Sequence, residues 1–123
     1  NEMELPKQTV VFYIAEEAVN NARKHAQADE IVVSLNYMAQ DKEFILLEVA
    51  DNGAGFDVQA VNQAYERRGS LGMVNLRERA DLINGHLNIH SAPGRGTRVR
   101  VIIPVNQAAA DRLQRGLLRQ QRQ

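Results

Sequence analysis

The sequence has 123 residues, of which 44% are hydrophobic and 24% charged, and its 15 basic and 15 acidic side chains leave no formal net charge. A chain of this size can bury one core, and its balanced charge gives no reason to expect the body of the domain to bind nucleic acid or a membrane surface. The sequence contains no cysteine, which excludes disulfides and thiolate metal sites, and no apolar run approaches the length of a membrane span.

Residues 7–28 are predicted to form a long amphipathic helix, because Pro6 suits a first helical turn and apolar residues then recur at helical spacing. The apolar stripe comprises Val11, Ile14, Ala15, Ala18, Ala22 and Ala26, whereas Glu16, Asn20 and Arg23 should face water. A second stripe at the edge of the apolar face holds Glu17, Asn21, Lys24 and Ala28, with His25 nearer the apolar side. Its carboxylate, amide and ammonium groups can converge on one ligand, but the solvated flank of an ordinary amphipathic helix gives the same pattern.

Two strands, 30–38 and 43–50, are predicted to form a hairpin around the polar turn 39–42. In the second strand Ile45, Leu47 and Val49 share one parity, and Asp51 continues it. If this apolar row faces the core, Asp51 also points inward and needs a hydrogen-bond donor, because an unpaired buried carboxylate is costly. The alternative is a loop aspartate that caps its own turn.

The glycine-bearing stretch 51–57 (DNGAGFD) directly follows this strand and has the layout of a ligand floor. It lacks the lysine of a Walker A loop, and Val58 stands where the dinucleotide fingerprint needs a third glycine. Gly53 and Gly55 occupy positions where an EF-hand needs oxygen ligands. These three kinds of site are therefore excluded.

Residues 57–68 are polar and weakly helical, and the loop 69–72 (GSLG) leads into a second amphipathic helix over 73–84, with Gly85 as its predicted C-terminal stop. A glycine-bearing loop at a helix start offers backbone N–H groups and a positive dipole end to an anion. Such loops are common, so the sequence leaves both a phosphate site and a plain helix start open.

Two further strands, 85–92 and 96–105, are predicted around the turn 91–96. His86 and His90 alternate with apolar residues, which places them on a strand and argues against a shared metal ion. Thr97 shares parity with the apolar residues of its strand, so its hydroxyl should face the core side, whereas Arg98 and Arg100 should face solvent.

The last segment, 106–123, is rich in Ala, Gln and Arg, and its basic residues are Arg112, Arg115, Arg119 and Arg122. We predict a frayed or solvated tail; the alternative is a short helix whose stripe of Leu113, Leu117 and Leu118 docks on a partner. The predicted division is therefore one domain at 1–105 and a C-terminal tail at 106–123. Because the sequence opens on Asn1 and not on Met, we expect a piece of a longer protein, with any sensor or membrane segment upstream. We expect this domain to be cytoplasmic, in a parent protein that a membrane segment could anchor.

Four motifs occur in an order that resembles the GHKL ATPases, the superfamily of gyrase, histidine kinases and MutL. They are 17–25 (EAVNNARKH), similar to the N box, 51–56 (DNGAGF), similar to the G1 box, 71–73 (LGM), similar to the G2 box, and 94–97 (GRGT), similar to the closing Gly-Thr. The ordered combination is specific and spans most of the chain. It implies the Bergerat ATP-binding fold, an α/β (α+β) two-layer sandwich with helices on one face of a mixed, mostly antiparallel sheet.

Within this superfamily, residues 75–80 (NLRERA) and the form of the N box are similar to sensor kinases that partner NarL-type response regulators. The resemblance implies the catalytic domain of a protein histidine kinase, which binds Mg-ATP and donates the γ-phosphate to a histidine on a dimerisation domain. None of His25, His86 and His90 has the context of that acceptor, so we expect it on a domain absent from this chain. The implied partners are ATP, Mg²⁺, the dimerisation domain and, through the full-length kinase, a NarL-type regulator, without direct nucleic-acid or membrane contact.

Carried over residue by residue, the resemblance implies that Asn21 binds Mg²⁺, Lys24 contacts phosphate and Asp51 accepts a hydrogen bond from the adenine amino group. Glu17 matches the hydrolytic base of gyrase-like members. Phosphoryl transfer to a histidine needs mainly alignment and charge neutralisation, so whether Glu17 acts as a base stays open. His25 would line the ribose or adenine side.

The glycines and the closing threonine have their own implied roles. Gly53 and Gly55 would let the nucleotide approach closely, and Thr97 would place its hydroxyl near the Asp51 end of the pocket. The G2 box, Leu71, Gly72 and Met73, would meet the phosphates through Gly72 and the amides that follow it.

The sequence departs from the family pattern at Ser70, where many relatives have glycine, so the ATP lid expected over 56–71 should be less pliant than usual. Two other functions use the same fold. One is a serine protein kinase of the anti-sigma-factor type, against which the stretch 77–80 (RERA) counts, and which phosphate on a partner serine would identify. The other is a non-catalytic module that binds ATP only to change shape or hold a partner, which ATP binding without transfer would identify.

Overall fold

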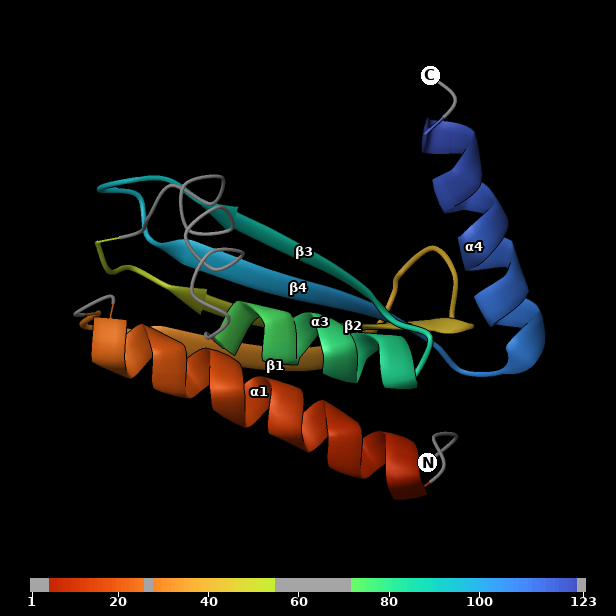
Figure 1. Ribbon diagram of the computed structural model, residues 1–123, viewed down its shortest axis with the longest axis horizontal. Coiled ribbons are helices and arrows are strands. Elements are labelled where there is room, and N and C mark those ends of the chain that lie inside the picture. Colours follow the sequence, from red (N-terminus) through yellow and green to blue (C-terminus); the bar gives the residue numbers. More distant parts are fainter. Residues whose placement is uncertain (1–4, 26–27, 55–71, 122–123) are drawn as a thin grey trace.

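The computed structural model describes residues 5–25, 28–54 and 72–121. Its elements are α1 (Leu5–His25), β1 (Ile31–Tyr37), β2 (Phe44–Asp51), α3 (Gly72–Leu82), β3 (His86–Ser91), β4 (Thr97–Pro104) and α4 (Gln107–Gln121). Helices α1 and α3 pack against each other over one face of a four-stranded sheet with the order β1-β2-β4-β3 (Figure 1). The predicted two-layer sandwich is confirmed, and every strand pair in the described residues is antiparallel. No helix in these ranges is both long and apolar enough to span a bilayer.

The inner face of the sheet and the two helices share one hydrophobic core. Its buried residues include Ile45, Leu47 and Val49 of β2, Val99, Val101 and Ile103 of β4, and Val11, Ile14 and Ala18 of α1. The predicted strand parity is therefore confirmed, as is the predicted helical stripe from Val11 to Ala22; its last member, Ala26, lies outside the described residues. Each large aliphatic side chain in such a core contributes about 1.5–3 kcal/mol through burial, so the core fixes which face of each strand points inward.

The end of α3 differs from the prediction. Asn84, not Gly85, has the left-handed backbone conformation, with φ of 57°. The N–H of Gly85 donates to the carbonyl of Ala80 at 2.8 Å, and the N–H of Asn84 donates to that of Asp81 at 3.1 Å. These bonds form a Schellman motif, in which asparagine is the residue that best replaces glycine because it tolerates the left-handed region.

The C-terminal segment forms helix α4, so the prediction of a frayed tail is wrong. The alternative is correct as to the helix, whereas the docking of its leucine stripe on a partner stays a prediction. Asn106 caps the helix, because its Oδ1 accepts the N–H of Ala109 at 2.8 Å. Ala109 has no exposed surface and Ala110 only 8%, so the first turns are packed against the domain. Leu113 and Leu117 are half-buried, whereas Leu118 is exposed.

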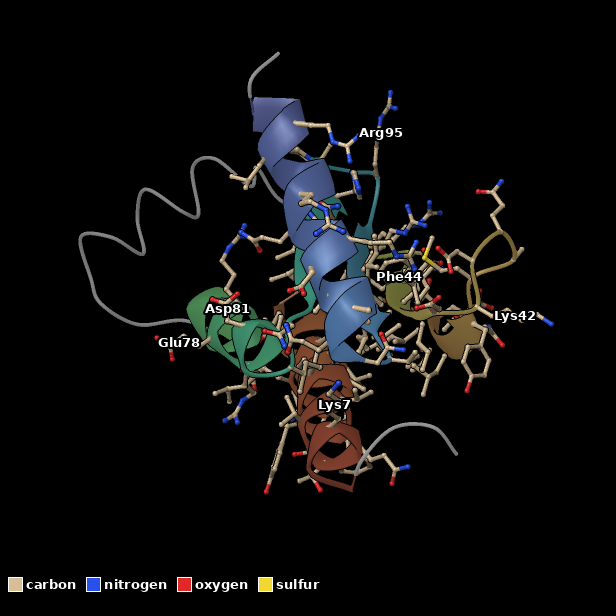
Figure 2. The ribbon with its side chains drawn as sticks, turned by 90° about the vertical axis from the view of Figure 1, so that its right-hand side faces the viewer. Lys7, Lys42, Phe44, Glu78, Asp81 and Arg95 are labelled. Atoms are coloured by element: carbon tan, nitrogen blue, oxygen red, sulfur yellow. The ribbon has the colours of Figure 1, made fainter. Side chains whose placement is uncertain are left out.

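Arg112 ties α4 to the β1–β2 hairpin. Its guanidinium lies 2.9 Å from Oδ2 of Asp41 and 3.4 Å from Oε2 of Glu43, and it stacks 5.1 Å from the centre of the Phe44 ring. Phe44 lies beside α4 when the molecule is viewed from that end (Figure 2). The sequence did not reveal this docking because Arg112 and Asp41 are 71 residues apart.

Strand β1 is an edge of the sheet and carries exposed apolar side chains. Val33, Leu35 and Tyr37 pair in register with the buried row of β2, yet they are 48%, 45% and 44% exposed. Phe12 of α1 is 65% exposed, and none of the seven residues of β1 is charged. The described part of the chain therefore has an uncovered apolar margin along β1.

Candidate functional site

One end of the sheet gathers the segments in which sequence motifs were found. There β2 ends, β4 begins and β3 ends, and the C-terminal end of α1 lies at the same end of the molecule (left in Figure 1). Asp51 pairs with Thr97 across β2 and β4, and Thr97 pairs with Ser91 across β4 and β3. These three side chains, which we call the rim row, therefore lie next to one another across three strands.

A cavity of ≈ 540 Å³ opens at this end of the sheet. All three members of the rim row line it, together with Ala50, Ile89, His90, Ala92, Arg95, Gly96 and Arg98. The lining combines apolar surface with a carboxylate, two hydroxyls and cationic side chains. That mixture suits an organic ligand with a flat apolar part and a few polar groups to be recognised.

Asp51 is half-buried, and its two carboxylate oxygens differ in their hydrogen bonding. Oδ1 accepts the N–H of Gly53 at 2.8 Å, so Asp51 does cap its own turn, which was one of the two interpretations. Asp51 also shares the parity of the buried β2 row and lines the cavity, as the second interpretation, an inward-pointing carboxylate, predicts. Within the described ranges its Oδ2 accepts no hydrogen bond, so Asp51 retains acceptor capacity at the cavity.

Gly96 brings β4 against the end of β2. It is buried, its φ is 74°, and a Cβ added to it would overlap the carbonyl oxygen of Asp51. The N–H of Gly94 also donates to the carbonyl of Ala54. The 94–97 stretch thus holds Thr97 directly opposite Asp51, as the register shows.

Sequence reasoning missed two residues that build this end of the sheet. Asn52 accepts the N–H groups of Asp29 at 2.9 Å and Glu30 at 3.0 Å through its Oδ1, which fastens the end of β2 to the segment before β1. Ser91 places its Oγ 3.0 Å from the Gly96 carbonyl and 2.8 Å from Oγ1 of Thr97. Both roles depend on strand pairing, which the sequence does not show directly. The sequence signals that could have indicated these roles are an asparagine directly after a strand and a serine at the end of one.

Glu17 and Asn21, the predicted residues of α1 whose side chains are described, are not among the described residues that line the cavity. Glu17 and Asn21 are half-buried, as expected at the edge of the apolar face, whereas Glu16 and Arg23 are exposed. Asn20, which was predicted to face water, is half-buried as well, so burial does not separate it from Asn21.

Other residues that were predicted to contact the ligand lie at the ends of the described ranges or outside them. Lys24 and His25 belong to the last turn of α1, and Gly72 and Met73 begin α3, but apart from this backbone placement their side chains are outside what the structure describes. Gly55 and Leu71 lie outside the described residues, as does the predicted helical stretch 57–68. In the part of the chain that is described, no three His, Cys, Asp or Glu side chains are grouped closely enough to bind a metal ion.

Residues 75–80 lie in α3, and part of this stretch packs α3 against the rest of the domain. Leu76 and Ala80 are each 1% exposed and belong to the core. The Arg79 guanidinium lies 5.1 Å from the centre of the Tyr13 ring, a cation–π contact that joins α3 to α1. Glu78 and Asp81 are exposed on the outer side of α3 (Figure 2). The stretch therefore contributes to the packing of α3 on α1.

Residues 7–107 match the family model described as histidine kinase-, DNA gyrase B- and HSP90-like ATPase. The chain belongs to this ATPase family. The match contains the rim row, α3 and all of α1 except its first two residues, and it ends where α4 begins. The resemblance inferred from the four ordered motifs is thereby confirmed.

Curated relatives of this ATPase domain include sensor kinases. The chain is 41% identical over 95 residues to an uncharacterized sensor-like histidine kinase of Chloroflexus aurantiacus, covering 77% of the chain and 16% of that protein. It is 34% identical over 99 residues to the signal transduction histidine-protein kinase/phosphatase DegS of Bacillus subtilis, covering 80% and 24%. It is 39% identical over 99 residues to the oxygen sensor histidine kinase NreB of Staphylococcus carnosus, covering 80% and 26%. The chain thus spans about a quarter or less of the length of these relatives.

Solved structures share the fold of the domain. The histidine kinase domain of a blue-light activated histidine kinase from Erythrobacter litoralis EL346 superposes with a TM-score of 0.66 at 23% identity, covering 84% of this chain and 46% of that one. The ATP binding domain of PrrB from Mycobacterium tuberculosis gives 0.61 at 23% identity, covering 78% and 67%. The Bergerat fold implied by the sequence motifs is confirmed.

Proposed function

We propose that this chain is the ATP-binding catalytic domain of a sensor histidine kinase, which binds Mg-ATP and donates the γ-phosphate to a histidine on a dimerisation domain. The observation that carries the proposal is the Asp51–Thr97 cross-strand pair, which lines the cavity inside the region matched by the ATPase family model. The names of the curated relatives support a kinase over the other functions that use this fold.

The adenine end of the nucleotide is proposed to meet Asp51 and Thr97. A carboxylate that faces the exocyclic amino group of adenine accepts a hydrogen bond, whereas guanine has an acceptor at the equivalent position and would be repelled. The unused Oδ2 of Asp51 and the apolar surface of Ile89 supply an acceptor and a packing surface for such a ring. We assign the remaining contacts at the adenine end to Gly53, Gly55 and His25.

The phosphate end is proposed to lie toward α1 and the start of α3. Asn21 would hold Mg²⁺ through its amide oxygen, a ligand type that suits a hard cation. The described residues offer no carboxylate cluster, which fits an ion that takes most of its ligands from phosphates and water. When bound, Mg²⁺ neutralises phosphate charge. Lys24 and the amides at the G2 box, Leu71 to Met73, would contact the phosphates, and Glu17 would help to orient the reacting groups.

The domain boundaries, the response regulator and the cellular location belong to the same proposal. We place the catalytic unit at 1–105 and treat α4 as an appended element, which the end of the family match at residue 107 supports. A NarL-type response regulator is the proposed final phosphate acceptor, on the strength of the 75–80 stretch and the form of the N box. A cytoplasmic location, where Mg-ATP is abundant, is proposed with it.

Calorimetric titration with ATP, in the presence and absence of Mg²⁺, tests the nucleotide site. Asp51→Ala and Asn21→Ala are each expected to abolish measurable binding or weaken it at least about tenfold, because each removes a hydrogen bond or ligand to a charged or buried group. Asn20→Ala is the matched control on the same turn and should bind as the wild type does. If Asn20→Ala weakens binding as much as Asn21→Ala, the assignment of Asn21 is wrong.

Incubation with γ-labelled ATP and the isolated dimerisation domain of the parent kinase tests the transfer. Acid-labile label on a histidine of that domain supports the kinase. Label on serine, or intact ATP binding with no label on any partner, would instead indicate the serine kinase or the non-catalytic module.

A further inference from the structure

We propose that Ser91 is a positioning residue that fixes the Thr97 hydroxyl as a hydrogen-bond acceptor, and that this makes the cavity select a purine with an amino group at position 6 over one with an oxygen there. The inference rests on the proposed function, because it concerns the base of the same nucleotide. It assigns a role to a residue that the four sequence motifs do not contain.

Two of the hydrogen bonds that Ser91 makes determine where the Thr97 proton points. Ser91 Oγ lies 3.0 Å from the carbonyl oxygen of Gly96 and 2.8 Å from Oγ1 of Thr97. A carbonyl oxygen can only accept, and a serine hydroxyl has one proton to donate. Ser91 therefore donates to Gly96. Its contact with Thr97 is then a hydrogen bond in which Thr97 donates and Ser91 accepts.

The Thr97 hydroxyl consequently offers only lone pairs to the cavity. Its single proton is engaged by Ser91, and no other side chain or backbone group of the described residues bonds to it. Its cross-strand neighbour Asp51 is acceptor-only when ionised and has Oδ2 to spare. Two acceptors therefore stand side by side on the rim of the cavity.

The backbone holds this arrangement in place. Ser91 and Thr97 are register partners in the β3–β4 ladder, so their side chains lie on the same face at adjacent positions. Gly96, whose carbonyl takes the Ser91 proton, is packed against the backbone of Asp51 and has little room to move. The direction of the hydrogen bonds is thus fixed by the sheet and does not depend on a ligand.

A pair of acceptors discriminates between 6-amino and 6-oxo purines. The amino group of adenine can donate to both members of the pair, whereas the oxygen of a 6-oxo purine would place lone pairs against lone pairs. A buried polar site rejects an analogue that leaves its groups unpaired. Without Ser91 the Thr97 hydroxyl can rotate and donate to the 6-oxo oxygen, which relieves part of this rejection.

Calorimetric titration with ATP and with inosine triphosphate, its 6-oxo analogue, tests the inference. In Ser91→Ala we expect the ratio of the ATP affinity to the inosine triphosphate affinity to fall about three- to tenfold, the effect of one neutral hydrogen bond. Ser91→Thr keeps a hydroxyl and should keep the ratio. In a Thr97→Val background, which lacks the hydroxyl, adding Ser91→Ala should change the ratio no further. Asn88→Ala is the control, since Asn88 is exposed on the opposite face of the same strand.

The outcomes separate this inference from the proposed function. Wild-type protein that binds neither nucleotide overturns both. A wild type that binds ATP, together with a folded Ser91→Ala protein whose ratio is unchanged, overturns the inference alone. A fall in the ratio that persists in the Thr97→Val background also overturns it, because Ser91 would then not act through Thr97. If Ser91→Ala does not fold, Ser91→Cys, with a weakly hydrogen-bonding thiol, takes its place with the same expectation.

Discussion

Gly96 lies so close to the carbonyl group of Asp51 that no side chain fits at position 96. The contact joins the first residues of β4 to the last residue of β2 at the rim of the cavity. It therefore sets the spacing between the Asp51 carboxylate and the Thr97 hydroxyl, which are the two groups that the proposed function assigns to the base.

Gly96→Ala is predicted to destabilise the domain by about 2–4 kcal/mol, because the new Cβ would meet the Asp51 backbone and the residue would keep a positive φ. Urea denaturation followed by far-UV circular dichroism measures the change. Gly94→Ala is the matched control: Gly94 also has a positive φ, 80°, but open space around its missing Cβ, so only the backbone cost of about 1–2 kcal/mol is expected. Equal losses in the two variants would contradict the close contact as the cause.

Much of the fold could be predicted from the sequence because local patterns determine it. The alternation of Ile45, Leu47 and Val49 fixed the inward face of β2, and the helical stripe fixed the inward face of α1; both are confirmed by burial. The motifs around Asp51 and Thr97 were also recognisable locally, and the register shows that they meet.

The features that the sequence did not reveal depend on contacts between distant segments. The hydrogen bonds of Ser91 exist only once β3 and β4 pair. The docking of α4 depends on Asp41 and Glu43, which no pattern within 106–123 can indicate. The stop of α3 was misplaced by one residue because Asn84 and Gly85 can each adopt the left-handed conformation, and tertiary packing decides between them.

The contact between Arg112 and Asp41 should make the docking of α4 sensitive to acid. The Arg112 hydrogen bond, aided by the N–H of Glu43, holds the pKa of Asp41 below its ordinary value. A lowered carboxyl pKa means that the folded state favours the ionised form, so the stabilisation is complete above a pH of about 4 and is lost as the pH falls through the lower folded-state pKa. An NMR titration of the Asp41 carboxyl carbon measures this pKa: Arg112→Ala should raise it toward the ordinary value, and the remaining hydrogen bond from the N–H of Glu43 should keep it somewhat below that value.

Arg115→Ala provides the control for this titration. Arg115 is exposed on the same helix and has the same charge, but it makes no contact with Asp41 in the described structure. The Asp41 titration should be unchanged in this variant. A shift as large as that in Arg112→Ala would mean that the overall charge of α4, and not the specific hydrogen bond, lowers the pKa.

Asn84→Ala is predicted to destabilise the domain by about 1 kcal/mol, because alanine in the left-handed conformation brings its Cβ against the following carbonyl oxygen without the local hydrogen bonding of asparagine. Asn84→Gly removes the Cβ and should be within about 0.5 kcal/mol of the wild type or more stable. Thermal or urea unfolding of both variants checks the prediction. If Asn84→Gly is the less stable of the two, the Schellman assignment is wrong.

The uncovered margin of β1 should make the isolated chain self-associate at high concentration. An edge strand with exposed apolar residues and no charge is a template for pairing with another chain. Leu35→Lys places a charge on this margin and is predicted to lower the association measured by sedimentation velocity. Leu82→Lys is the control, since Leu82 is 72% exposed but lies on α3, which packs on α1 and on β3 at the opposite edge of the sheet. Equal effects of both substitutions would indicate general surface hydrophobicity and not the strand edge.

The rim row and the docking point of α4 lie at opposite ends of the long axis of the molecule (Figure 1). Helix α4 is therefore a place to attach a reporter without disturbing the cavity. The chain contains no cysteine, so Gln114→Cys, at an exposed position of α4, would accept a single fluorophore without any other residue being removed. A protein labelled in this way, or immobilised through this helix, would keep its cavity facing solution while ligand binding is followed.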